Sequence, residues 1–206
     1  MIDVLATFII FFAVIDPIGT IPVFIAVTDQ FDQKTKRRIA LLATIFSACI
    51  LIFFVVVGEL ILKALSIPLS AFQISGGIVL FLFALNMIFG DSKPEAEIKL
   101  LKKDHRETAI FPLAVPSIAS PGAMLAAVLL TENTLFSLWE QTQTVLVMLS
   151  VIVLVYILML LAGWINKIIG SSGASVVSRI MGFILSAVAT TNILAGLGEY
   201  YKIFHV

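Results

Sequence analysis

Long apolar runs separated by short polar stretches make up most of this chain. Six of the runs are long enough to cross a bilayer, since a spanning helix needs roughly 20 mainly apolar residues. They cover residues 4–28, 39–62, 72–90, 110–130, 144–166 and 176–198. Within each run the apolar residues are continuous rather than alternating, which favours helices over membrane strands. The pattern predicts an all-α membrane protein with six transmembrane helices.

Five polar stretches connect these runs, at residues 29–38, 63–70, 91–109, 132–144 and 166–175. The longest of them contains "PEAEIKLLKKDHRE", in which charges of both signs recur at helical spacing. We interpret this segment as a solvated or surface-lying helix, with binding of anionic lipid as the alternative.

Basic residues in the polar stretches predict the orientation, because cytoplasmic loops retain Lys and Arg. Eleven of the 13 Lys and Arg residues lie in or beside the stretches 29–38, 91–109 and 166–175. The other two are Lys63 and Lys202. We therefore expect a multi-pass protein of the cell (inner) membrane, with these three stretches in the cytoplasm and both termini outside. No basic residue or cleavage pattern of small residues marks the first run, so we expect no removable signal peptide.

The composition excludes several classes of protein. The chain has 60% hydrophobic and 13% charged residues, whereas a soluble domain carries about 25% charged residues. The net charge is zero and does not indicate a nucleic-acid partner. Cys49 is the only cysteine, and His105 and His205 lie far apart, so we expect neither an internal disulfide nor a metal site.

The third and sixth runs resemble each other. Aligned without gaps, "QISGGIVLFLFALNMI" (73–88) and "RIMGFILSAVATTNIL" (179–194) share four identical residues at an offset of 106. Near that offset, "AVIDPIG" (13–19) aligns with "SIASPGA" (117–123) through their prolines. Units of three helices enter the membrane from opposite sides, as in many secondary transporters. We predict two inverted three-helix repeats, 1–90 and 110–206, joined by a cytoplasmic linker, 91–109.

Prolines interrupt the first and fourth runs near their centres. Proline has no N–H and collides with the carbonyl four residues earlier, and the residue before it avoids the helical region. The pairs Asp16–Pro17 and Ser120–Pro121 are typical of helix starts, with an N-cap residue followed by proline at the first helical position. We predict that both helices are broken near the membrane midplane and that the two breaks approach each other. Kinks that serve packing alone are the alternative interpretation.

Two such breaks predict a binding site, because unpaired backbone groups are costly in hydrocarbon unless protein, water or a ligand pairs with them. The N-terminus of a half-helix carries about half a positive charge and suits a carboxylate. Asp16 adds a negative charge to the first break, whereas Ser120 adds none to the second. We hypothesise that the second break binds a substrate carboxylate and that Asp16 binds an ammonium group, a proton or Na⁺. A small zwitterion fits both.

Polar residues late in the third and sixth runs have two interpretations. Asn86 and Asn192 either form hydrogen bonds between helices or line the site. Thr190 and Thr191 place hydroxyls beside Asn192 and are candidates for the same surface.

Glycines and one charged pair have simpler interpretations. Gly76, Gly77 and Gly182 are expected where helices pack closely. Glu59 and Lys63 are four residues apart at the outer end of the second run, and we expect them to form an ion pair that reaches toward the interface.

At "IDPIGTIPVF" (15–24) and "FPLAVPSIASPGAM" (111–124) the chain resembles the MarC family (UPF0056) of membrane proteins, a group that includes the SnatA-type neutral amino-acid transporters. The resemblance covers nearly the whole chain and implies transport of small neutral amino acids such as glycine or alanine, coupled to a cation. Glycine is common in the family at the place of Ser120, a departure that bears on the shape and selectivity of the second break.

The motifs and the resemblance together predict the residues of the substrate site. They are Asp16, Pro17, Ile18, Gly19 and Pro22 in the first motif, Ala119, Ser120, Pro121, Gly122 and Ala123 in the second, and Asn86, Thr190, Thr191 and Asn192.

The leading hypothesis is a secondary active transporter that works by alternating access, with a small amino acid and the lipid bilayer as its partners. The chain has no GxxxxGK[ST] motif, so we expect an ion gradient, H⁺ or Na⁺, the substrate gradient or a partner to supply the energy. We expect no cofactor, no metal, no nucleic acid and no enzymatic activity. An accessory protein of another membrane assembly and a membrane-embedded enzyme are the alternatives, and the sequence does not predict an oligomeric state.

Overall fold

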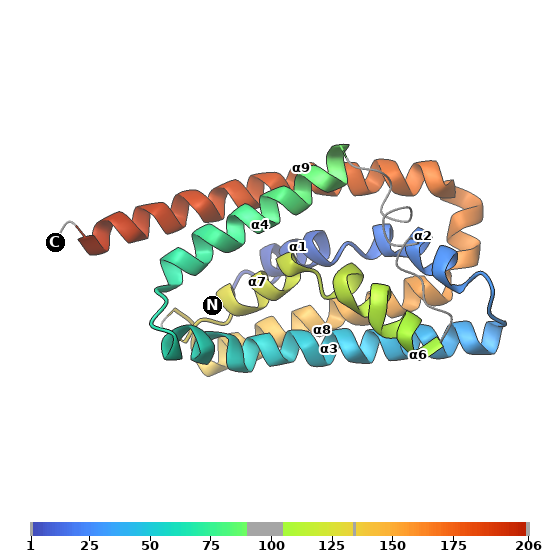
Figure 1. Cartoon of the computed structure of the whole chain (residues 1–206), viewed down its shortest axis with the longest axis horizontal. Helices are drawn as coiled ribbons and strands as arrows, with labels where there is room; N and C mark the ends of the chain where they lie inside the picture. The colour runs from blue at the N-terminus through green and yellow to red at the C-terminus, as the bar shows by residue number, and fades with distance from the viewer. Residues whose placement is uncertain (1, 90–104, 134, 205–206) are drawn as a thin grey trace.

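The computed structural model describes residues 2–89, 105–133 and 135–204. Its elements, in chain order, are α1 (Val4–Ile15), α2 (Pro17–Thr28), α3 (Gln33–Ala64), α4 (Leu69–Phe89), α6 (His105–Thr108), η1 (Ala109–Ile118), α7 (Pro121–Leu129), α8 (Leu138–Leu160) and α9 (Ala162–Phe204) (Figure 1). The described residues contain no strand. Most of the predicted linker 91–109 lies outside the described residues.

Five helical segments in the described part of the chain are long and apolar enough to cross a membrane, with α1 and α2 counted together as one segment, Val4–Thr28. A sixth candidate is the pair Arg106–Ile118 and Pro121–Leu129, which is bent by 59°. The predicted all-α class is therefore confirmed, with five to six candidate membrane spans where six were predicted, and the arrangement as two inverted repeats stays a prediction.

Two helices begin earlier than the apolar runs predict. The Asp32 side chain accepts a hydrogen bond from the Lys34 N–H and caps α3, so the helix starts within the polar stretch 29–38. At α8, Ser137 and Glu140 form a reciprocal capping box, an arrangement that pairs two N–H groups at a helix start. The polar residues after Ser137 are therefore helical, not a loop.

The predicted loop 166–175 is wrong, because these residues are helical. The predicted fifth helix ends at Leu160, and α9 then continues for 43 residues from Ala162 to Phe204. Glycine lowers helix stability by only about 1 kcal/mol, and the stretch has no proline to interrupt the backbone. Figure 1 shows α9 turning a corner near its start and then running along α4.

The broken segment α1–α2 lies at the centre of the molecule. In its most apolar window 61% of the residues are buried, against 22% in α4 and in the spanning part of α9. Helices α3 and α8 lie on one side of this segment and α4 and α9 on the other, with α7 and η1 packed between them (Figure 1). Among the five spans that are compared in this way, the one that contains the first proline motif is thus the most buried.

Helices pack closely at the three predicted glycines. A Cβ at Gly77 would lie 3.1 Å from the Ala189 carbonyl oxygen of α9, and one at Gly182 would lie 3.1 Å from the Ala84 carbonyl oxygen of α4. At Gly76 a Cβ would collide with a leucine side chain of α7. The interpretation of these glycines as packing positions is confirmed.

Candidate functional site

The first break consists of a single residue. Asp16 adopts the left-handed conformation (φ 52°, ψ 67°) between α1 and α2, a region that Asp tolerates better than most residues. Its N–H donates to the Phe12 carbonyl at 3.0 Å, and its Oδ1 accepts from the Gly19 N–H at 2.9 Å. Asp16 therefore ends α1 and also caps α2, and the predicted N-cap is confirmed.

The second break is longer and more irregular. Phe111 and Val115 have extended backbone angles inside η1, because each precedes a proline and the helical region is disfavoured there. Ser120 is also extended, and its Oγ accepts from the Ala123 N–H at 3.1 Å. The predicted N-cap at Ser120 is confirmed, whereas the two irregularities at Phe111 and Val115 were not expected.

The two breaks meet in the interior. The Ser120 hydroxyl donates to the Val14 carbonyl at 2.7 Å, across 106 residues of sequence. Val14 lies in the last turn of α1, where carbonyls lose their partners within the helix. Nearby, the hydroxyl oxygens of Thr20 and Ser117 lie 3.4 Å apart. We call these four residues and Asp16 the junction.

The junction is closed to solvent. Asp16 is 1% exposed, and Thr20, Ser117 and Ser120 are 0% exposed. A solute can reach these groups only if at least one of the surrounding elements moves.

A hydroxyl of α3 supports the second break from outside the junction. Ser47 is buried, and its hydroxyl donates to the Ala43 carbonyl of the same helix at 2.8 Å. The same hydroxyl lies 3.5 Å from the Ala114 carbonyl oxygen of η1. The Ala114 carbonyl also accepts from the Ala119 N–H at 2.8 Å. The irregular backbone of η1 is thus paired by protein groups at this point, as burial in a membrane requires.

The two half-helices leave the junction in opposite directions (Figure 1). α2 leads to the first residues of α3, whereas Val128 near the end of α7 packs against Gly58, close to the other end of α3. Both helices start at the junction, so it receives the positive ends of two helix dipoles and one carboxylate. Such a site suits a small solute that carries charges of both signs. Among the described residues, no group of three or more His, Cys, Asp or Glu could hold a metal ion.

The structure brings most of the predicted motif residues to or beside the junction. Gly122 packs against Leu80 of α4 and against Val14. Pro22 is half-buried inside α2 and does not end the helix. The other predicted motif residues are buried Pro17, Gly19, Ala119 and Ala123, half-buried Ile18, and exposed Pro121.

The four predicted residues of α4 and α9 are less buried than the junction. Asn86, Thr190 and Thr191 are exposed, and Asn192 is half-buried. The two threonine hydroxyls donate to carbonyls of their own helix at 2.8 and 2.9 Å. None of the four has the burial of the junction residues, and their part in a substrate site stays a prediction.

Sequence reasoning missed three hydroxyls at or near the junction, those of Thr20, Ser117 and Ser47. Thr20 follows Asp16 by four residues, and its hydroxyl donates to the Asp16 carbonyl at 3.0 Å. Ser117 precedes Pro121 by four residues. Both hydroxyls thus lie four residues, about one helical turn, from a motif residue, and this spacing would have identified the pair. Nothing in the sequence connects Ser47 with η1.

Comparison with known proteins identifies relatives across the whole chain. The profile of the family described as "MarC family integral membrane protein" matches residues 1–201. The chain is 32% identical over 188 residues to a UPF0056 membrane protein of Methanocaldococcus jannaschii, covering 90% of this chain and 91% of that protein. It is 31% identical over 203 residues to the UPF0056 membrane protein YvbG of Bacillus subtilis, covering 95% and 94% of the two chains. No solved structure matches.

Proposed function

This chain belongs to the MarC family of integral membrane proteins, and we propose that it is a secondary active transporter of small neutral amino acids of the glycine and alanine class. In this proposal the solute crosses the cell membrane by alternating access around the junction, with coupling to H⁺ or Na⁺. The observation that carries the proposal is the hydrogen bond from Ser120 to the Val14 carbonyl. It joins two interrupted helices from distant parts of the chain at one buried point.

The chemistry of the junction suits a zwitterion. In this proposal the N-terminus of α7 binds the solute carboxylate, because Ser120 adds no charge of its own there. Asp16 at the start of α2 takes the ammonium group or the coupling cation. Small residues beside the two motifs, Gly19, Ala119 and Ala123, favour a small solute.

Packing between α4 and α9 supports the inverted-repeat arrangement. A Cβ at Gly77 would meet Ile193, and one at Gly182 would meet Met87. Gly182 follows Gly77 by 105 residues, and Met87 precedes Ile193 by 106 residues. The two contacts are therefore equivalent at nearly the offset of the sequence repeat. Two repeats related by an axis in the membrane plane produce such paired contacts. With the positively charged stretches in the cytoplasm, both termini then lie outside.

Transport by the purified protein tests the proposal. Protein in liposomes should take up labelled glycine or alanine, faster under an imposed pH or Na⁺ gradient than without one, while empty liposomes should not. Absence of uptake of any small neutral amino acid by folded protein would refute the proposal and favour the accessory role. Chemical conversion of a substrate would favour the enzyme.

A further inference from the structure

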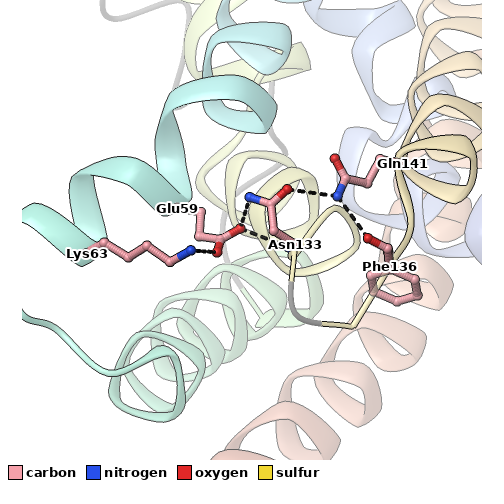
Figure 2. Close-up of polar contacts among 5 residues, drawn as sticks. All are labelled: Glu59, Lys63, Asn133, Phe136 and Gln141. Atoms are coloured by element: carbon pink, nitrogen blue, oxygen red, sulfur yellow. Dashed lines mark hydrogen bonds and ion pairs between the residues drawn. The ribbon is translucent and has the colours of Figure 1, made fainter.

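A polar cluster joins α3 to the connection between α7 and α8 (Figure 2). The Glu59 carboxylate accepts from the Asn133 backbone N–H at 2.8 Å and from the Asn133 side-chain amide. Its other oxygen pairs with Lys63, as the sequence predicted. One carboxylate thus receives three donors from two elements.

The cluster extends to the start of α8. The Gln141 side-chain amide donates to the Asn133 side-chain oxygen at 3.0 Å and to the Phe136 carbonyl at 3.0 Å (Figure 2). The position of Asn133 is therefore determined from both sides, by α3 and by α8.

This cluster lies close in sequence to α7, which begins beside the second break. α7 runs from Pro121, next to the second break, to Leu129, only four residues before Asn133. The same helix packs on α3 where Val128 meets Gly58, the neighbour of Glu59. A shift of α7 away from α3 would separate Asn133 from Glu59.

We propose that the contact between Glu59 and Asn133 is a latch that holds α7 against α3. The latch closes the junction on the side of the molecule where the connection between α7 and α8 lies. The inference rests on the proposed alternating access at the junction. Beyond the proposed function, the inference states that access to the junction is controlled by a gate and that α7 is this gate.

The charge arrangement suits a contact that opens and closes. Glu59 and Lys63 are both on α3, and their side chains are 11% and 62% exposed. When Asn133 leaves, Lys63 remains paired with Glu59, so opening does not leave a buried charge without a partner, which would be strongly unfavourable. At Glu59 itself, the two hydrogen bonds from Asn133 have to break, and water at the exposed side of the cluster can replace them.

Accessibility of a thiol at the junction tests the latch without any transport substrate. Ser117→Cys in a Cys49→Ala background places a near-isosteric thiol at a 0% exposed position. In lipid nanodiscs, a membrane-impermeant methanethiosulfonate reagent should label it slowly. Adding Glu59→Gln or Asn133→Ala should raise the labelling rate about tenfold, as expected when a charge-assisted hydrogen bond that favours the closed state is lost.

Glu199→Gln is the matched control. It makes the same chemical change in an exposed pair, where the Glu199 carboxylate lies 3.9 Å from the Lys202 ammonium on α9, and it should leave the labelling rate unchanged. Thr20→Cys serves as a second reporter if Ser117→Cys does not fold. Equal labelling with and without the latch substitutions overturns the latch, and so does an equal increase in the control. Increased labelling in a protein that transports no amino acid refutes the proposed function and leaves the latch standing.

Discussion

Asp16 ends one helix and begins the next, and its left-handed backbone makes both possible. Its carboxylate caps α2 from a position that is 1% exposed. A carboxylate near the middle of an apolar segment costs about 2.5–3.5 kcal/mol on insertion scales. Capping alone does not require that charge, because asparagine caps a helix equally well.

Asp16→Asn should therefore separate the fold from the proposed transport. Asparagine adopts the left-handed conformation and caps helices, so the thermal unfolding temperature should change little. Amino-acid uptake in liposomes should fall at least about tenfold, because the charge that pairs with an ammonium group or a coupling cation is gone. Uptake at the unmodified rate would show that the charge of Asp16 is not part of the mechanism.

Ser120→Ala should destabilise the protein. The change removes the cap of α7 and leaves the buried Val14 carbonyl without the donor that the structure provides. The expected loss is about 2 kcal/mol in the free energy of unfolding, measured by reversible unfolding in detergent. Ser150→Ala is the matched control, because that hydroxyl is exposed and donates only within α8. Equal effects at the two positions would contradict the importance of the junction bond.

At the scale of the elements, prolines predicted where the helices break but not how the breaks are arranged. Pro17 and Pro121 mark positions where a helical hydrogen bond is impossible, and α2 and α7 begin at these two residues. The approach of Thr20 to Ser117 depends on packing between segments 97 residues apart, which local sequence does not encode.

The repeated asparagines illustrate the same limit. Asn86 and Asn192 occupy matching positions of the two similar stretches 73–88 and 179–194, yet Asn86 is exposed and Asn192 half-buried. The sequence match records that two helices are alike, not which face of each helix points inward. Likewise, polarity alone suggested a loop at 166–175, but without a proline the helix continues.

Gly77→Leu should weaken the packing of α4 on α9. Even a Cβ at this position would lie 3.1 Å from the Ala189 carbonyl oxygen and closer still to Ile193, so the helices would have to separate. Overpacking of this kind costs about 1–3 kcal/mol, seen as a lower unfolding temperature in detergent. At Gly198, also in α9, a Cβ meets nothing within 4 Å, and Gly198→Leu should not lower the unfolding temperature. Similar losses at both sites would argue against close packing at Gly77.

At the scale of the whole molecule, buried and exposed apolar surfaces are distributed unlike those of a soluble protein. The centre is α1–α2, while α4, α8 and the spanning part of α9 expose large apolar side chains such as Leu82, Val153 and Phe183. Such a surface is stable only against lipid or other protein. Burial is thus concentrated around the junction rather than spread over all helices.

The proposed orientation predicts which connections are reached from outside the cell. In a Cys49→Ala background, Leu65→Cys lies between α3 and α4 and should react with an impermeant thiol reagent in intact cells. Gln30→Cys lies between α2 and α3 and should react only after the membrane is opened, because the first turns of α3, directly after this connection, carry basic residues typical of the cytoplasmic side. The reverse pattern would show that the chain inserts with the opposite orientation.

The uninterrupted length of α3 has a consequence for how the protein sits in the bilayer. Its 32 residues measure about 48 Å at 1.5 Å per residue, whereas the hydrocarbon layer is about 30 Å thick. We therefore expect the first turns, with Lys34, Lys36, Arg37 and Arg38, to lie at the level of the lipid phosphates. Attraction of these residues to anionic headgroups would resist movement of the helix along the membrane normal, and α3 would then fix the depth at which the two interrupted segments meet.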